Sequence, residues 1–129
     1  MDYIDCAGAS GANYRFFNVK DSRPQSMAGG GYVYVRLEGA EPTILYASET
    51  DNLFMGAVDR WSEAVEQYGA THLYTRLNVS GQTRRNELQD ILRAHRPAMN
   101  PPLPEAPVEA ADADQDEAKA DRAENRQNA

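Results

Sequence analysis

Cysteine is almost absent from this chain of 129 residues. Cys6 is the only one, so no intrachain disulfide can form and nothing in the sequence points to an oxidising compartment. Long apolar runs are also absent, because no stretch approaches the roughly 20 apolar residues that span a membrane. The first residues lack the basic start and the apolar run of a secretory signal. We therefore expect a cytoplasmic location without a membrane partner.

Several familiar catalytic motifs are also absent. The glycine run at 29–31 is not followed by the Gly-Lys-Ser/Thr of a phosphate-binding loop. His72 and His95 have no suitably spaced partners for a zinc site. Cys6 lies in an arm rich in Gly, Ala and Ser, where no base can be positioned beside it to make it a nucleophile. These absences leave tyrosine chemistry as the remaining option.

The negative charge is concentrated near the C-terminus. Of the net charge of −7, residues 101–129 contribute eight acidic and three basic side chains, whereas residues 1–100 contribute twelve and ten. Pro, Ala, Asp and Glu dominate the end of the chain without an aromatic residue, which predicts a disordered acidic tail over 103–129. This tail is also a candidate contact for a protein partner. Because the body is nearly neutral and salt screens charge within about 10 Å, a DNA partner remains compatible with the composition.

Hydrophobic periodicity and turn residues predict the order of the secondary structure. We expect a loose arm over the first twelve residues, and a hairpin with a longer loop at 38–42. The expected strands are 14–19 as an edge strand, 32–37, 43–48 and 71–78, and the expected helices are 54–68 and 84–94. This order is typical of an α+β fold with a small antiparallel sheet covered by helices.

Three segments carry a resemblance to a known family. They are Gly31-Tyr32-Val33-Tyr34, the stretch from Ile44 through Tyr46 to Leu53, and His95-Arg96-Pro97-Ala98-Met99-Asn100. In this order they resemble the GIY-YIG nuclease family over about residues 30–102. The resemblance implies a three-stranded antiparallel sheet flanked by helices and an endonuclease that hydrolyses DNA with Mg²⁺ or Mn²⁺. Residues 1–29 are then an N-terminal arm that holds the edge strand.

The resemblance also assigns roles to individual residues. Hydrolysis of a phosphodiester needs a group that takes the proton of water, a metal that stabilises developing charge and a cation near the leaving oxygen. The family supplies them with two tyrosines, a glutamate that binds the metal and an arginine. The residues implied here are Tyr34, Tyr46 and Arg60 for catalysis, Glu87 for the metal, and Ser48, Arg84, Arg85 and Asn100 for substrate binding. Which tyrosine acts as the base is left open.

Some of these positions differ from the family pattern. Tyr32 and Ser48 stand where the two signatures carry glycine, which often permits close approach of the backbone. The family's arginine aligns with Gly56 and Ala57, and we hypothesise that Arg60 reaches the site from one turn beyond Gly56.

Two interpretations remain open for the metal ligand, and two for the pair Arg84 and Arg85. The family's glutamate aligns with Leu88 in one register and with Glu87 in another, and one residue rotates a helix position by about 100°. Arg84 and Arg85 at a helix start indicate either an anion site or a solvated face. The sequence therefore also fits a catalytically impaired GIY-YIG-like module that binds DNA or another protein.

Overall fold

The computed structural model of the chain describes residues 1–20 and 26–102, so the predicted acidic tail lies outside the described residues. The strands are β1 (Tyr3–Ala7), β2 (Asn13–Asn18), β3 (Gly30–Glu38), β4 (Glu41–Thr50) and β5 (His72–Leu77). The helices are α1 (Leu53–Gly56), α2 (Trp61–Tyr68) and α3 (Gly81–His95). The predicted α+β class is confirmed. Within the described ranges, no helix is long and apolar enough to cross a membrane.

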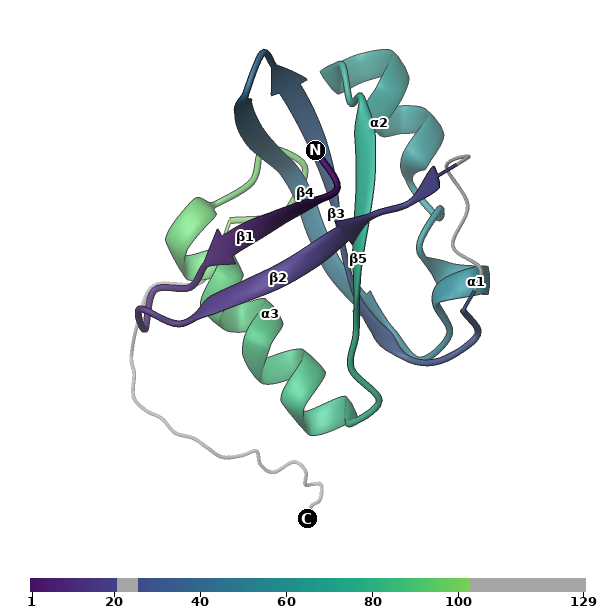
Figure 1. Cartoon of the computed structure of the whole chain (residues 1–129), viewed down its shortest axis with the longest axis vertical. Coiled ribbons are helices and arrows are strands. Elements are labelled where there is room, and N and C mark those ends of the chain that lie inside the picture. The colour runs from purple at the N-terminus through teal and green to yellow at the C-terminus, as the bar shows by residue number, and fades with distance from the viewer. Residues whose placement is uncertain (21–25, 103–129) are drawn as a thin grey trace.

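The strands form one antiparallel sheet in the order β1-β2-β5-β3-β4 (Figure 1). The predicted three-stranded sheet is therefore wrong in detail, because β1 and β2 extend it to five strands. The predicted edge strand is β2, but β1 lies outside it, and the first twelve residues are not a loose arm. Ile4 and Cys6 alternate with exposed neighbours in β1, as a half-buried strand requires. Two apolar residues were too few to reveal the strand by periodicity.

The β3–β4 hairpin lies at one side of the sheet and turns more tightly than predicted. Glu38 pairs with Glu41, so only Gly39 and Ala40 connect the strands, and Gly39 has a φ of 66°. A two-residue hairpin turn favours glycine at such a positive φ. Pro42 belongs to β4 rather than to a loop, which is tolerated because β4 is an edge strand.

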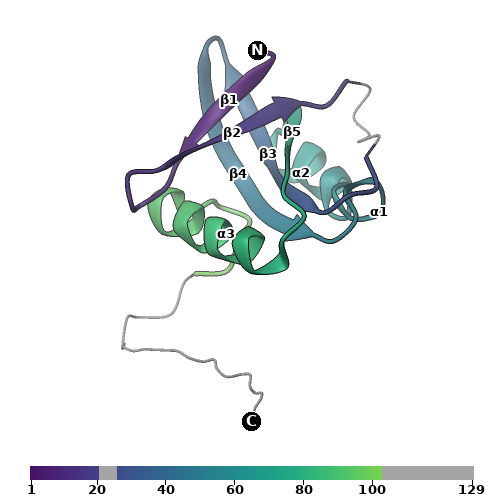
Figure 2. The same ribbon diagram turned by 60° about the horizontal axis from the view of Figure 1, so that its bottom comes forward.

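Helices cover both faces of the sheet (Figure 2). One core, which includes Tyr34, Leu53 and Ala64, lies between the sheet and α1 with α2. The other core, which includes Val33 and Ile91, lies between the sheet and α3. Consecutive residues of β3 thus serve opposite faces, because side chains alternate along a strand.

The single helix predicted over 54–68 is wrong, because residues 57–60 separate α1 from α2. The break follows from a tertiary hydrogen bond. The backbone N–H of Arg60 donates to the hydroxyl of Tyr34 at 3.0 Å, so it is not available to a continuous helical ladder. The helix predicted at 84–94 is confirmed as α3, which begins one turn earlier at Gly81.

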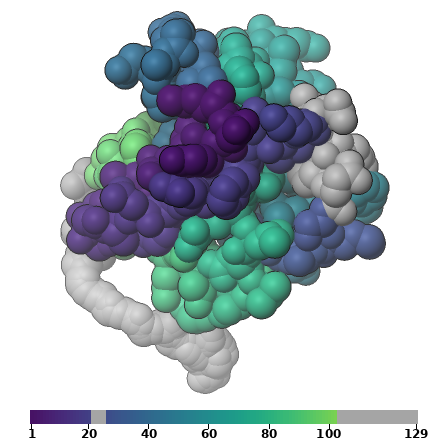
Figure 3. Space-filling model, viewed as in Figure 1, coloured from purple at the N-terminus to yellow at the C-terminus, as the bar shows by residue number. Residues whose placement is uncertain are grey.

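Hydrogen bonds to α3 hold the β1–β2 hairpin in place at the edge of the sheet. Asp90 accepts hydrogen bonds from the Ser10 hydroxyl (2.6 Å), the Ser10 N–H (2.9 Å) and the Tyr14 hydroxyl (2.6 Å). At the end of α3, His95 Nε2 contacts the Ala7 carbonyl oxygen at 2.9 Å. Figure 3 shows the N-terminal residues, in purple, lying across the middle of one face of the molecule.

Candidate functional site

Three tyrosines meet on the sheet face that α1 and α2 cover. Tyr34 pairs with Tyr46 across the hairpin, and Tyr32 lies two residues before Tyr34 on the same face. Their ring centroids are 5.2 Å (Tyr34–Tyr46), 5.8 Å (Tyr32–Tyr34) and 6.2 Å (Tyr32–Tyr46) apart. The side chains are 2%, 0% and 9% exposed for Tyr32, Tyr34 and Tyr46, so only Tyr46 approaches the surface.

The hydroxyl of Tyr34 is held inside the protein. It accepts a hydrogen bond from the N–H of Arg60. It also donates a hydrogen bond, either to the Ala57 carbonyl oxygen at 2.9 Å or to Asp59 Oδ1 at 3.2 Å. Burial is the largest cause that raises the pKa of Tyr34 above its ordinary value. A tyrosine whose hydroxyl stays protonated and already makes its hydrogen bonds inside the protein is a poor general base. The Tyr34 hydroxyl is therefore better suited to a structural role.

We expect Tyr34→Phe to destabilise the fold by about 1–2 kcal/mol, because the Arg60 N–H loses its acceptor and the Ala57 carbonyl its donor. Thermal unfolding followed by circular dichroism measures the loss. Tyr3→Phe is the matched control, since Tyr3 is 45% exposed at the sheet edge. Equal melting temperatures for the two variants would contradict a structural role for the Tyr34 hydroxyl.

Arg60, the residue that caps the start of α2, lies beside Tyr46. Its guanidinium carbon lies 5.0 Å from the centroid of the Tyr46 ring, and its Nη1 donates to the Met99 carbonyl at 3.1 Å. The same guanidinium donates twice to Glu63, at 2.9 and 2.8 Å. Glu63, and to a lesser degree Tyr46, raise the pKa of Arg60. The structure therefore brings Tyr34, Tyr46 and Arg60 together, but Glu63 already neutralises the arginine.

Glu87 lies on the opposite side of the sheet from the tyrosines. It lines a narrow cleft together with Ser48 and Arg84 and with residues of the core beneath α3, among them Val33, Ala47 and Ile91. Its carboxylate accepts from Arg76 at 2.9 and 3.3 Å and is 17% exposed. The structure thus does not bring Glu87 to Tyr46 or Arg60.

The metal implied by the family resemblance does not fit these residues. A divalent ion at Glu87 would have to displace the Arg76 guanidinium, whose positive charge repels it. Among residues 1–20 and 26–102, no three side chains of His, Cys, Asp or Glu gather closely enough to hold a metal. We therefore derive no chemical step through Mg²⁺ or Mn²⁺ at this position.

Two of the predicted substrate-binding residues hold the fold together. The Asn100 side chain accepts from the Ala47 N–H at 3.0 Å and donates to the Ala47 carbonyl at 2.9 Å, which covers the open edge of β4. Arg84 donates to Glu49 at 2.7 Å and to the carbonyls of Asn78 and Val79 at 3.2 and 3.0 Å. Both side chains thus bind groups of the protein itself, through both polar atoms of Asn100 and through Nε and Nη1 of Arg84.

The other two predicted binding residues lie apart from each other. Ser48 is partly buried on β4, where it pairs with Tyr32 of β3. Arg85 is exposed on α3 and belongs to a polar stripe along the side of that helix turned away from the sheet. This stripe consists of Gln82, Arg85, Asn86, Gln89 and Arg93, and Arg96 follows directly after the helix. All six residues are exposed, and we name them the outer face of α3.

The outer face of α3 carries three arginines and no acidic side chain. The nearest acids on the helix are engaged elsewhere, since Glu87 is paired with Arg76 and Asp90 binds Ser10 and Tyr14. Arg93 is close enough to contribute the smallest of the effects that lower the pKa of Asp90. The other described arginines, in contrast, form ion pairs with carboxylates, as the salt bridges of the described residues show.

Sequence reasoning missed the contacts that three charged residues, Asp59, Glu63 and Arg76, make with the predicted site residues. Asp59 accepts from the hydroxyls of Tyr32 and Tyr34, and Glu63 closes on Arg60. The Arg60–Glu63 spacing of three residues on a helix is a local signal for an ion pair that was readable from the sequence. Arg76 has no such signal, because its partner lies on a different element.

Comparison with known proteins gives no guide to this site. No family model, no curated protein and no solved structure matches the chain. The resemblance to the GIY-YIG family is neither supported nor opposed by them and stays a prediction. Function is therefore inferred from the residues themselves.

Proposed function

We propose that the chain is a GIY-YIG-like domain that binds DNA through the outer face of α3 and does not hydrolyse it. The order of elements supports the family assignment, since the β3–β4 hairpin is followed by helices, by β5 and by α3. The three strands β4, β3 and β5 are adjacent in that order and are flanked by helices, as the family pattern expects. β1 and β2 are an addition to this unit.

One observation supports the proposal that the chain does not hydrolyse DNA. The two charges that catalysis would use are each closed in an ion pair, Arg60 with Glu63 and Glu87 with Arg76. The two pairs lie on opposite faces of the sheet, so a single phosphate cannot contact both. A cation already neutralised by a carboxylate also stabilises a developing negative charge poorly.

The charge pattern of α3 supports a DNA partner. An α-helix fits the major groove of DNA, and α3, with 15 residues, is about 22 Å long. Arg85, Arg93 and Arg96 supply cations for phosphates, and the amide side chains between them are suited to base edges. None of these three arginines forms a salt bridge within the described residues, and Glu87 and Asp90, the acids nearest to Arg93, are bound to other side chains, so their charge is available to a polyanion.

The test combines DNA binding with DNA cutting by the full chain. Three phosphate contacts predict that affinity for a labelled duplex falls about 40-fold between 50 and 200 mM salt. Fluorescence anisotropy measures the affinity, and nicking of supercoiled and branched DNA with Mg²⁺, with Mn²⁺ and with chelator measures hydrolysis. We expect salt-sensitive binding and no nicking in any of the three conditions.

Variants locate the binding surface. Arg85→Gln, Arg93→Gln and Arg96→Gln should each weaken binding and each lower the slope of log affinity against log salt by about one. Arg15→Gln is the control, since it also removes one positive charge but lies on β2 in an ion pair with Asp5. Equal effects of Arg15→Gln and Arg93→Gln would mean that net charge, and not the outer face of α3, governs binding.

An active endonuclease is the second candidate, because Tyr34, Tyr46 and Arg60 do meet at one place. It predicts metal-dependent nicking that Tyr46→Phe abolishes, since only the hydroxyl is lost from a packed ring. It further predicts that Glu87→Ala abolishes nicking if Glu87 is the metal ligand. Such cutting would overturn the proposal of a non-hydrolysing domain.

A further inference from the structure

We infer that the acidic segment 103–117 of this chain docks on the outer face of α3 and competes there with DNA. The docking itself needs only α3 and the tail and so goes beyond the proposed function. The competition rests on the proposed function. Three features of the chain lead to this assignment: where the chain leaves the domain, the charge of the segment and its length.

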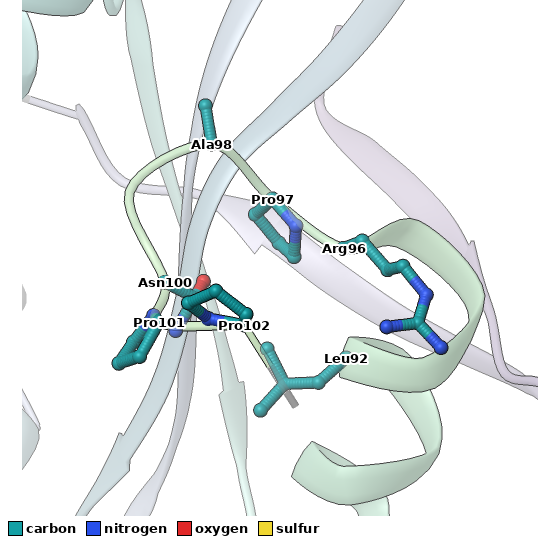
Figure 4. Close-up of a pocket in the computed structure, with 7 residues that line it drawn as sticks. All are labelled: Leu92, Arg96, Pro97, Ala98, Asn100, Pro101 and Pro102. Atoms are coloured by element: carbon teal, nitrogen blue, oxygen red, sulfur yellow. The ribbon is translucent and has the colours of Figure 1, made fainter. Parts of the chain in front are cut away.

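The chain leaves the described domain beside the end of α3. Pro101 and Pro102, the last described residues, line a pocket of about 300 Å³ together with Leu92 of α3 and with Arg96, which follows the helix (Figure 4). Asn100 holds this part of the chain in place, because its side-chain oxygen and nitrogen both form hydrogen bonds with the backbone of Ala47 on β4. Pro102 therefore lies beside Arg96, at the C-terminal end of the outer face.

The charge of the following segment complements that face. Residues 105–117 hold six acidic side chains and no basic one. The outer face of α3 holds three arginines and no acid. An acidic segment held close to a basic surface by a short connection has a high effective concentration, in the millimolar range for short flexible linkers. A contact with a dissociation constant in the millimolar range is then occupied for about half of the time.

The length of the segment matches the length of the helix. From Pro102 to Glu117 the chain has 15 residues, which span up to about 50 Å when extended. α3 is about 22 Å long, so the acids at 112–117 can reach Arg85 near its N-terminal end. That end is also where the helix dipole favours negative charge. The segment is therefore long enough to cover the whole outer face.

The direct test is NMR on the full chain, wild type and with a neutralised tail. The neutralised variant carries Asp112→Asn, Asp114→Asn, Asp116→Asn and Glu117→Gln. We expect amide shifts of residues on the outer face of α3 to change in this variant. The same shifts should appear when the salt concentration of the wild type is raised from 50 to 500 mM, since salt screens the contact.

A control variant with the same charge change separates docking from net charge. It carries Asp2→Asn, Glu41→Gln, Asp51→Asn and Glu66→Gln, all exposed acids of the described domain. Its α3 shifts should match the wild type. Unchanged α3 shifts in the tail variant would overturn the docking, and equal changes in both variants would overturn it as well.

DNA binding tests the competition separately. If the acidic segment occupies the outer face of α3 for half of the time or more, the tail-neutralised variant should bind DNA about two- to tenfold more tightly at low salt. Equal affinity in wild type and tail variant, with the α3 shifts changed, would overturn the competition but not the docking. Docking without DNA binding by either chain would overturn the proposed function and leave the tail contact established.

Discussion

We expect Gly30→Ala to lower the free energy of unfolding by about 3 kcal/mol, since overpacking against atoms that cannot move is costly. Gly30 begins β3 at the point where β3, β5 and α1 come together. A Cβ there would collide with the carbonyl oxygen of Arg76, and it would lie 2.8 Å from Cδ1 of Leu53. The carbonyl belongs to the neighbouring strand, so relief of the clash requires the sheet to separate.

The adjacent glycine supplies a matched control. A Cβ at Gly31 would lie 3.4 Å from the ring of Phe16, which is an ordinary contact. Gly31→Ala should therefore change stability by a few tenths of a kcal/mol, whereas Gly30→Ala should lower the melting temperature on the order of 15 °C. Thermal unfolding of both variants gives the comparison. Similar melting temperatures would show that β3 and β5 are not packed as closely as described.

The strands and helix with strong local patterns could be predicted from the sequence. β3, β4, β5 and α3 were all expected within a few residues of their ends, because β-branched and aromatic runs or a 3.6-residue period mark them. β1 was missed because its signal rests on Ile4 and Cys6 alone. The break before α2 was missed because it depends on the hydroxyl of Tyr34, 26 residues away in the chain.

Part of the candidate site could likewise be anticipated from the sequence, and part depends on tertiary packing. The pairing of Tyr34 with Tyr46 was implied by the family resemblance, and in the structure the register of the β3–β4 hairpin places the two opposite each other. The direction of Glu87 depends on how α3 is rotated against the sheet, where a single residue changes the direction by about 100°. Its partner Arg76 lies on β5, so the ion pair has no local signature. Tertiary packing, which periodicity does not encode, thus decides whether the charges that the GIY-YIG resemblance implies can meet.

We expect Arg84→Met to destabilise the fold by about 3 kcal/mol, because removing one partner of a buried ion pair leaves the other unpaired. Arg84 is 9% exposed and Glu49 is 23% exposed, so the carboxylate would lose its partner with little water to replace it. The carbonyls of Asn78 and Val79, which lead into α3, would lose a donor at the same time. Methionine keeps much of the length and apolar volume of the arginine stem, so the loss reports mainly on the charge.

Arg85→Met distinguishes this structural role from substrate binding. Arg85 is the next residue on α3, is exposed and lies on the outer face, so its replacement should leave the melting temperature nearly unchanged and weaken DNA binding. Arg84→Met should do the reverse: unfolding at a lower temperature, with DNA affinity unchanged below it. A stable Arg84→Met protein with lost DNA binding would return Arg84 to the binding surface. It would also show that the contact with Glu49 opens when DNA binds, because a guanidinium closed on a carboxylate cannot hold a phosphate as well.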